Sequence, residues 1–148
     1  MSAAVAYHTT SDVTLRRADL TDRDRVFDYN CSASTNAVSY SQHVRWFSGR
    51  IADPTSPIWI IEQYGEPVGT VRIDAKDGVN AKMSISLAAH AQGRGIGTYA
   101  IEAACTKWCG AVVAEIHESN TRSKTCFTAC GFAKIGRRDA FDVYLWSP

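Results

Sequence analysis

The chain lacks long apolar runs, a basic amino-terminal segment and an excess of charge of one sign. No hydrophobic stretch approaches the roughly 20 residues that a membrane-spanning helix needs, and residues 1–14 carry neither the basic nor the continuous apolar region of a secretion signal. The 16 Lys and Arg residues oppose 15 Asp and Glu residues, without the basic, aromatic-rich stripe that binds nucleic acid. We expect a cytoplasmic protein that binds neither a membrane nor nucleic acid.

The chain also has few cysteines, and their number is odd, which does not suit a disulfide framework. Five cysteines in a chain without an export signal favour reduced thiols. Cys105 with Cys109, and Cys126 with Cys130, are each four residues apart, so each pair could share a helix face and offer thiolates to a metal. Structural zinc sites usually have tighter spacings, and a free cysteine packs as a small hydrophobic residue. We therefore expect no metal site.

A length of 148 residues, 45% of them hydrophobic, suits one globular domain. We predict a flexible tail over residues 1–12 and a single domain over residues 13–148. Periodicity and capping signals predict its first part as a strand over Val13–Arg16, a helix that begins near Thr21, an unpatterned loop over Asn30–Tyr40 and a second helix capped by Ser41.

Strands follow in the middle of the chain. A hairpin is predicted over residues 58–74, and a strand over Lys82–Ala88 alternates apolar residues with Ser84, Ser86 and Ala88, whose small side chains leave room for a ligand. Helices and strands then alternate over Ile96–Trp108, Ala111–Ile116, Asn120–Cys130, Phe132–Ile135 and Phe141–Trp146. This order predicts an α/β fold in which a mixed sheet carries helices on both faces.

The glycine-rich turn after the strand that ends at Ala88 is the most informative segment. Gly93, Gly95 and Gly97 let the backbone turn tightly and expose amide N–H groups at the positive end of the next helix, which suits phosphate. The dinucleotide pattern G-x-G-x-x-G fails because Thr98 replaces its third glycine, and no Gly-Lys-Ser/Thr follows for a nucleotide P-loop. Arg94 either adds charge beside the phosphates or is a solvated loop residue.

Two segments carry a resemblance to a family. Gln92–Gly97 resembles the Q/R-x-x-G-x-G/A turn of GNAT acetyltransferases, in the strand-turn-helix context of that family. Residues 120–132 resemble its N-x-x-S-x-x-x-Y-x-x-x-G-F segment, with Phe127 at the tyrosine position. The resemblance implies a single GNAT-like domain with a mixed sheet of six to seven strands, and an enzyme that transfers an acetyl group directly from acetyl-CoA to a primary amine.

The same resemblance implies where acetyl-CoA binds. The cofactor lies between two parallel strands that splay apart, Lys82–Ala88 and Ala111–Ile116, with the pantetheine arm and thioester near the end of the first strand and the diphosphate at the glycine turn. The residues that the resemblance assigns to the cofactor are Leu87, Ala88, Gln92, Gly93, Arg94, Gly95, Ile96, Gly97, Thr98, Asn120 and Ser123.

Acetyl transfer needs a neutral amine, a stabilised oxyanion and a thiolate that can leave. Phe127 has no proton to give to the thiolate, so the acid is left open among Cys126, Tyr99 and solvent. Glu115 and His117 lie on the same face of their strand and are the candidate bases. An imidazole ordinarily titrates near neutral pH, which favours His117, and Glu115 could act directly or through water, although each could also be a surface residue.

The amino-terminal half bears on the acceptor. His43-x-x-Trp46-Phe47 and a G-x-P-V-G run at Gly65 resemble GNAT members that acetylate the 4-amine of nucleotide-linked amino sugars, and also members that act on protein amino termini. His43 and Trp46 suit substrate binding, although aromatic residues at helical spacing are more often core. We expect a small-molecule amine acceptor, a nucleotide sugar first. Peptide amines, other small amines and a non-catalytic acyl-CoA-binding module are the alternatives, and a homodimer is one option for assembly.

Overall fold

The computed structural model describes residues 12–33, 38–75 and 81–148. In these ranges the strands are β1 Val13–Arg17, β2 Ile58–Gln63, β3 Glu66–Asp74, β4 Lys82–Leu87, β5 Val112–His117, β6 Ala133–Arg138 and β7 Phe141–Trp146. The helices are α2 Arg23–Ala33, α3 Tyr40–Ala52, α4 Ile96–Trp108 and α5 Thr121–Ala129, with short 3-10 turns at Leu20–Asp22 and Ala89–Ala91. Except for Asp12, the predicted tail lies outside the described residues, as do positions 34–37 of the predicted loop.

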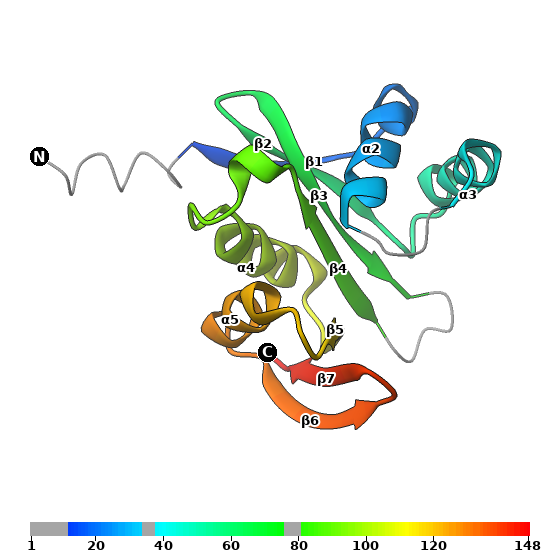
Figure 1. The fold of residues 1–148 in the computed structure, drawn as a ribbon. Coiled ribbons are helices and arrows are strands. Elements are labelled where there is room, and N and C mark those ends of the chain that lie inside the picture. The colour runs from blue at the N-terminus through cyan, green and yellow to red at the C-terminus, as the bar shows by residue number, and fades with distance from the viewer. Residues whose placement is uncertain (1–11, 34–37, 76–80) are drawn as a thin grey trace, which may run out of the picture.

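One mixed sheet has the strand order β1-β2-β3-β4-β5-β7-β6. Helices α2 and α3 cover one face, and α4 and α5 cover the other (Figure 1). The predicted α/β architecture with helices on both faces is therefore confirmed. No helix in the described ranges combines the length and the hydropathy that crossing a membrane requires.

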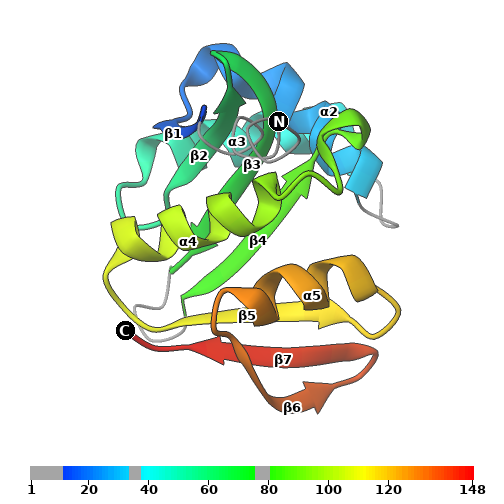
Figure 2. The ribbon, with the colours of Figure 1, turned by 90° about the vertical axis from the view of Figure 1, so that its left-hand side faces the viewer.

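The sheet opens between β4 and β5. These two strands run parallel and pair only through Lys82 and Val113, whereas β4 pairs with β3 as far as Leu87 and β5 pairs with β7 as far as His117. β4 thus remains paired with β3, β5 remains paired with β7, and β4 and β5 diverge from each other toward their carboxyl ends (Figure 2). The predicted pair of splayed parallel strands is confirmed.

The two faces of the sheet are filled unequally. On the α4 side, Val71, Ile73 and Met83 belong to the main buried cluster, while a smaller cluster of Phe47, Ile58 and neighbouring residues lies under α2 and α3. Residues that pair across neighbouring strands lie on the same face of a sheet. Ser84 of β4 pairs with Arg72 of β3, which pairs with Ile58 of β2, so the serines of β4 lie on this second face. These small side chains leave the space that their alternation predicts.

The N-cap of helix α3 lies two residues before the predicted one. Ser39, not Ser41, is the N-cap: its Oγ accepts from the Gln42 backbone N–H at 3.2 Å, and Gln42 Oε1 accepts from the Ser39 N–H at 3.1 Å. This reciprocal capping box satisfies two amides that a helix cannot satisfy itself. The Ser-x-x-Gln spacing at residues 39–42 is the sequence signal for this N-cap, whereas the apolar period alone favours Ser41.

Candidate active site

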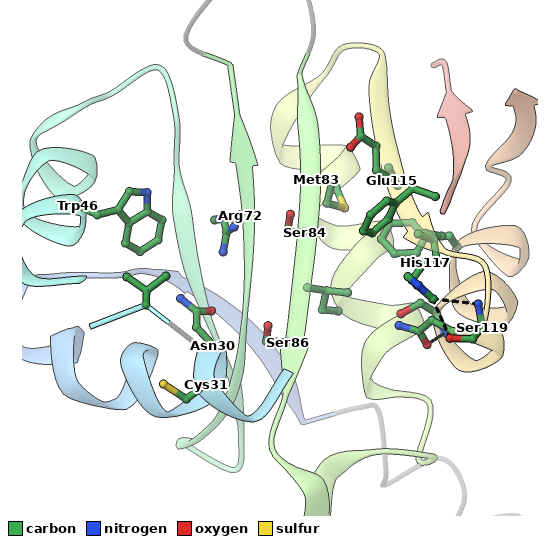
Figure 3. A pocket seen from close by; sticks show the side chains of 18 of the residues that line it. Asn30, Cys31, Trp46, Arg72, Met83, Ser84, Ser86, Glu115, His117 and Ser119 are labelled. Carbon is green, nitrogen blue, oxygen red and sulfur yellow. Dashed lines mark hydrogen bonds between the residues drawn. The ribbon is translucent and has the colours of Figure 1, made fainter. Parts of the chain in front are cut away.

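A cavity of about 930 Å³ occupies the opening between β4 and β5 and reaches α2 and α3. Its wall includes six of the predicted site residues, namely His43, Trp46, Glu115, His117, Asn120 and Ser123. Trp46 lies at one end of the cavity, and Glu115 and His117 lie at the other (Figure 3). The predicted diphosphate turn and the end of β4 are not part of this wall. Ser84 and Ser86, whose small side chains predict room for a ligand, are also in this wall, and polar wall residues that the sequence does not indicate include Asn30, Cys31 and Arg72.

The glycine turn has the backbone geometry of an anion site. Gly93 and Gly95 have φ angles of 73° and 80°, a region that side chains rarely allow, and Gly95 is the N-cap of α4 without a capping side chain. The first amides of α4 therefore have no intrahelical acceptor and face outward at the positive end of the helix. Ile96 can contribute only its backbone, because its side chain is fully buried.

Gly97 serves a different purpose from the other two glycines. It lies inside the first turn of α4 and is buried, and a Cβ there would be 3.5 Å from Leu87 Cδ1 and 3.6 Å from Cys126 Sγ. These are ordinary contact distances, so a methyl group would fit there, and Gly97, unlike Gly93 and Gly95, does not have the positive φ that favours glycine.

The Gln92 side chain joins the turn to two other elements. Its Nε2 donates to the Leu87 carbonyl at the end of β4 at 3.2 Å, and its Oε1 accepts from Arg122 of α5. Both polar ends are thus used inside the protein. The Gln92 side chain therefore positions the turn, and only the backbone of this residue is available to contact a phosphate.

The end of β4 directs peptide groups into the opening. Ala88 N–H donates to Val68 O at 2.8 Å, so the amide expected of Ala88 is already used within the sheet. In an antiparallel pair, alternate residues direct their peptide groups to the same side, so those of Ile85 and Leu87 face β5. Ala81 fits this alternation, because its carbonyl accepts from β5. Leu87 therefore offers its N–H to the opening. The residues present fit the pantetheine and diphosphate of a CoA thioester.

His117 lies at the exposed end of β5, where Ser119 orients its ring (Figure 3). Nδ1 is 2.7 Å from Ser119 Oγ and accepts from the Ser119 backbone N–H at 3.2 Å. A backbone N–H can only donate, so in this arrangement Nδ1 holds the lone pair and Nε2 the proton. The Ser119 hydroxyl can also accept from a protonated Nδ1, and that tautomer presents a basic Nε2.

Glu115 projects from the same face of β5 but is engaged with cations. Both of its carboxylate oxygens accept from Arg138 Nη2, at 2.6 and 2.7 Å, and Lys82 Nζ lies 3.9 Å away. Arg138 thus engages both carboxylate oxygens of Glu115. Of the two predicted bases, His117 is therefore the less encumbered.

The aromatic end of the cavity is packed tightly. His43 is buried, its Nε2 is 2.7 Å from the Arg23 carbonyl oxygen, and its ring stacks on Phe47. These contacts join α3 to α2. Trp46 lies beside His43, with the Arg72 guanidinium 5.2 Å from its ring centroid. His43 therefore supports the wall, and Trp46 and Arg72 present groups to the space.

Residues 12–133 match the family model described as an acetyltransferase (GNAT) domain. The chain belongs to the GNAT acetyltransferase family. It is thus an acetyl-CoA-dependent N-acetyltransferase, with acetyl-CoA as the acetyl donor. A search of curated protein sequences returns no match.

Solved structures share the fold of this GNAT domain. A spermidine N-acetyltransferase from Vibrio cholerae, in complex with CoA and spermine, has a TM-score of 0.78 at 17% identity, over 92% of this chain and 94% of that chain. An N-acetyltransferase from Staphylococcus aureus Mu50 has a TM-score of 0.76 at 17% identity, over 91% and 98%. A protein provisionally assigned as a phosphinothricin N-acetyltransferase has a TM-score of 0.71 at 24% identity, over 90% and 95%. At these identities the likeness shows the fold alone.

Phe127 occupies the tyrosine position of the second GNAT motif as a packed core residue. It is buried, lines the cavity and meets Phe132 edge to face, with ring centroids 4.9 Å apart. Tyr99 is exposed on α4 and outside the cavity wall, and no tyrosine is among the described residues that form this wall. Of the candidate acids, Cys126 lies against Gly97 in the first turn of α4.

The cysteines of this GNAT domain are held as thiols. Burial raises the pKa of Cys105 to about 11 and that of Cys130 to about 12. Cys130 Sγ donates to the Thr98 carbonyl at 3.3 Å, and Cys109 Sγ donates to the Thr106 carbonyl at 3.0 Å. Across residues 12–33, 38–75 and 81–148, no three His, Cys, Asp or Glu side chains gather closely enough to hold a metal ion.

Proposed function

We propose that this enzyme transfers the acetyl group directly to a small primary amine that enters the cavity from the α2 and α3 side. The observation that carries the proposal is the opening of the sheet beyond the single pair of Lys82 and Val113. In this proposal the opening leads from the cavity wall at Trp46 and Arg72 to the Leu87 amide and to the start of α4, which has no capping side chain. Donor and acceptor therefore have separate entrances that meet at β4.

In this proposal the backbone amides from Gly93 to Thr98 bind the diphosphate, and Arg94 adds a charge from the exposed loop. Asn120 and Ser123 border the pantetheine arm at the start of α5. Asn120 Oδ1 already accepts from the Ser123 N–H at 3.1 Å, so the side-chain amide offers its NH₂ group to the ligand. The Leu87 N–H points into the opening, where it donates to the thioester carbonyl oxygen as negative charge develops on it.

The reaction then needs one proton acceptor and one proton donor. The amine nitrogen attacks the thioester carbonyl carbon, the C–S bond breaks, and CoA leaves as a thiolate that takes up a proton. We assign removal of the amine proton to His117, directly or through water, and keep Glu115 as the second candidate. Because Phe127 has no proton to give, the thiolate receives its proton from solvent or from Cys126.

The acceptor stays open within the class of small amines. A nucleotide-linked amino sugar is supported by the His43 to Phe47 pattern and by the accessible Trp46 ring, and the comparisons add nothing to it. The solved neighbours are named for spermidine and phosphinothricin, which belong in any test. One observation, Phe127 in place of the tyrosine, favours a second function: binding acyl-CoA without catalysing transfer.

An acceptor panel with acetyl-CoA tests the proposal. The panel holds nucleotide-linked 4-amino sugars, spermidine, phosphinothricin, amino acids and peptides, and release of the CoA thiol is followed with a thiol reagent. We expect release with at least one small amine at a rate that depends on both substrates. Tight binding of acetyl-CoA by calorimetry, without thiol release on any member, would instead support the non-catalytic module.

A further inference from the structure

Arg72 places a guanidinium in the wall of the cavity at its acceptor end. It lies in the middle of β3 and pairs across the sheet with Ser84, on the face that α2 and α3 cover. Its side chain is 27% exposed, a large fraction for the middle of an interior strand. Figure 3 shows it between Trp46 and Ser84, facing the same space as Asn30.

The described residues compensate the charge of Arg72 only weakly. Its Nε is 3.5 Å from Asp74 Oδ2, and its guanidinium also lies over the face of Trp46. Asp74 binds Arg50 more closely, and Arg50 is buried and also donates to the carbonyls of Ser56 and Ile73. Two guanidiniums thus share one carboxylate. Burial first, and then the nearby charge of Arg72, lower the pKa of Arg50 although Asp74 opposes the shift.

The rest of the described cavity wall does not supply the missing negative charge. Glu115 is the only acid among these residues, and it is held by Arg138 and Lys82 at the far end. The other polar side chains at the acceptor end are His43, whose Nε2 is engaged with the Arg23 carbonyl, and the uncharged Asn30, Cys31, Ser84 and Ser86. Among the described residues, the acceptor end therefore carries one positive charge more than its carboxylates balance, and this charge lies beside a face of Trp46.

We propose that the acceptor amine carries an acidic group, a carboxylate or a phosphate, and that Arg72 binds this group. The inference rests on the proposed function and narrows its substrate class. A planar guanidinium presents paired N–H donors that match either oxyanion, and Trp46 and Asp74 hold it in one orientation. An acidic anchor at Arg72 leaves the amine of a short molecule to reach the opening of the sheet. Polyamines, which carry only positive charge, are repelled.

Matched pairs of acceptors test this specificity. Each pair differs in the acidic group: amino acids against their carboxamides, phosphoethanolamine against ethanolamine, and a nucleotide-linked amino sugar against the free amino sugar, with spermidine as the cationic member. Thiol release gives kcat/KM for each, and calorimetry on the CoA-saturated protein gives binding without turnover. The enzymes compared are wild type, Arg72→Gln, Arg72→Lys and, as a control for loss of charge, Arg45→Gln on the exposed part of α3.

We expect acidic members to exceed their neutral partners at least tenfold in kcat/KM. Arg72→Gln should remove about 10- to 100-fold of that advantage, and Arg72→Lys should restore part of it. Arg45→Gln and all reactions of neutral members should stay near wild type. Whether carboxylate or phosphate pairs show the preference identifies the acidic group.

Three results would overturn the inference. A higher kcat/KM for spermidine or for a neutral member would overturn the inference and leave the proposed function intact. The same holds if Arg72→Gln lowers kcat/KM equally for the acidic and the neutral member of a pair. If no acceptor of any charge reacts, the proposed function fails, and calorimetry then decides the inference. Binding of acidic members alone would retain it, and binding of none would end it.

Discussion

His117 and Glu115 leave the same face of β5 and meet different partners. Ser119 orients the imidazole, whereas Arg138 holds the carboxylate with both oxygens. We expect His117→Ala to lower kcat by about 100-fold, the usual contribution of a positioned base, with unchanged affinity for acetyl-CoA. Glu115→Gln should lower kcat less than about tenfold, because Arg138 already occupies both carboxylate oxygens of Glu115. Steady-state thiol release checks both, and a larger loss in Glu115→Gln would exchange the two assignments.

Asp22 is a fully buried carboxylate that remains charged. Burial alone would raise its pKa, but hydrogen bonds from Arg16 at 2.8 Å, from the Asp19 backbone N–H at 2.9 Å and from Arg25 at 2.7 Å lower that pKa to about 2. A lowered folded-state pKa stabilises the protein above the ordinary carboxyl pKa. This stabilisation is lost as the pH falls from about 4 toward 2.

Asp22→Asn should therefore reduce the free energy of unfolding at pH 7 by about 2 kcal/mol. The difference from wild type should shrink between about pH 4 and pH 2, because the wild-type carboxylate becomes protonated there. Urea unfolding at a series of pH values measures it. A difference that stays constant down to pH 2 would show that packing, and not charge, is what Asp22 contributes.

Some site residues could be read from the sequence and others could not. Alternation along a strand places Glu115 and His117 on one face, and a strand-turn-helix context identifies Gly95 as a helix start. Arg72 alternates with Val71 and Ile73 as a solvent-facing residue would. Nothing local shows that α2 and α3 close over that face, so the role of Arg72 appears only after the chain is folded.

Among the elements, strands β3 and β4 approach each other closely at the carboxyl end of β4. Gly69 pairs with Leu87, and a Cβ at Gly69 would lie 2.3 Å from the Ser86 carbonyl oxygen. Gly69→Ala must push the strands apart, so we expect a loss of about 1–3 kcal/mol in unfolding free energy and weaker acetyl-CoA binding through the displaced Leu87 amide.

Gly49 is the matched control for Gly69. It is exposed on α3, and a Cβ there meets nothing within 4 Å. Gly49→Ala should stabilise the protein by about 0.5–1 kcal/mol, because alanine has the higher helix propensity. Urea unfolding of both variants tests the pair, and equal effects would mean that the close approach of β3 and β4 is not under steric control.

The start of α4 offers a charge test that leaves the turn geometry constant. Gly95 has a φ of 80°, so any side chain there strains the backbone. Gly95→Asn and Gly95→Asp share that strain and differ in charge. We expect the Asp variant to bind acetyl-CoA at least tenfold more weakly than the Asn variant, because its carboxylate faces the diphosphate. Calorimetry gives both dissociation constants, and equal values would place the diphosphate away from this turn.

Element types follow well from local patterns, and their ends follow less well. The hairpin, the β4 alternation and the helix after the glycine turn are all present as predicted. The start of α3 depends on a reciprocal pair of hydrogen bonds between Ser39 and Gln42, which outweighs the apolar period that favours Ser41. The 3-10 turn before α2 is likewise set by a local capping box between Asp19 and Asp22.

In the molecule as a whole, the proposed function depends on the opening between β4 and β5 in a sheet that is otherwise continuous. The order of elements predicts a mixed sheet, and the family resemblance predicts that β4 and β5 separate. The shape of the acceptor end depends on how α2 and α3 pack through His43 and Phe47, which are contacts between segments far apart from β4 in the chain. No local sequence pattern therefore indicates which residues line the acceptor end.

A crystal structure of the protein with acetyl-CoA would locate the bound cofactor. We expect the diphosphate against the amides of Gly93 to Thr98, and the thioester in the opening between β4 and β5, within hydrogen-bonding distance of the Leu87 N–H. An acetyl-CoA molecule bound elsewhere, with this turn and opening filled only by solvent, would contradict this expectation.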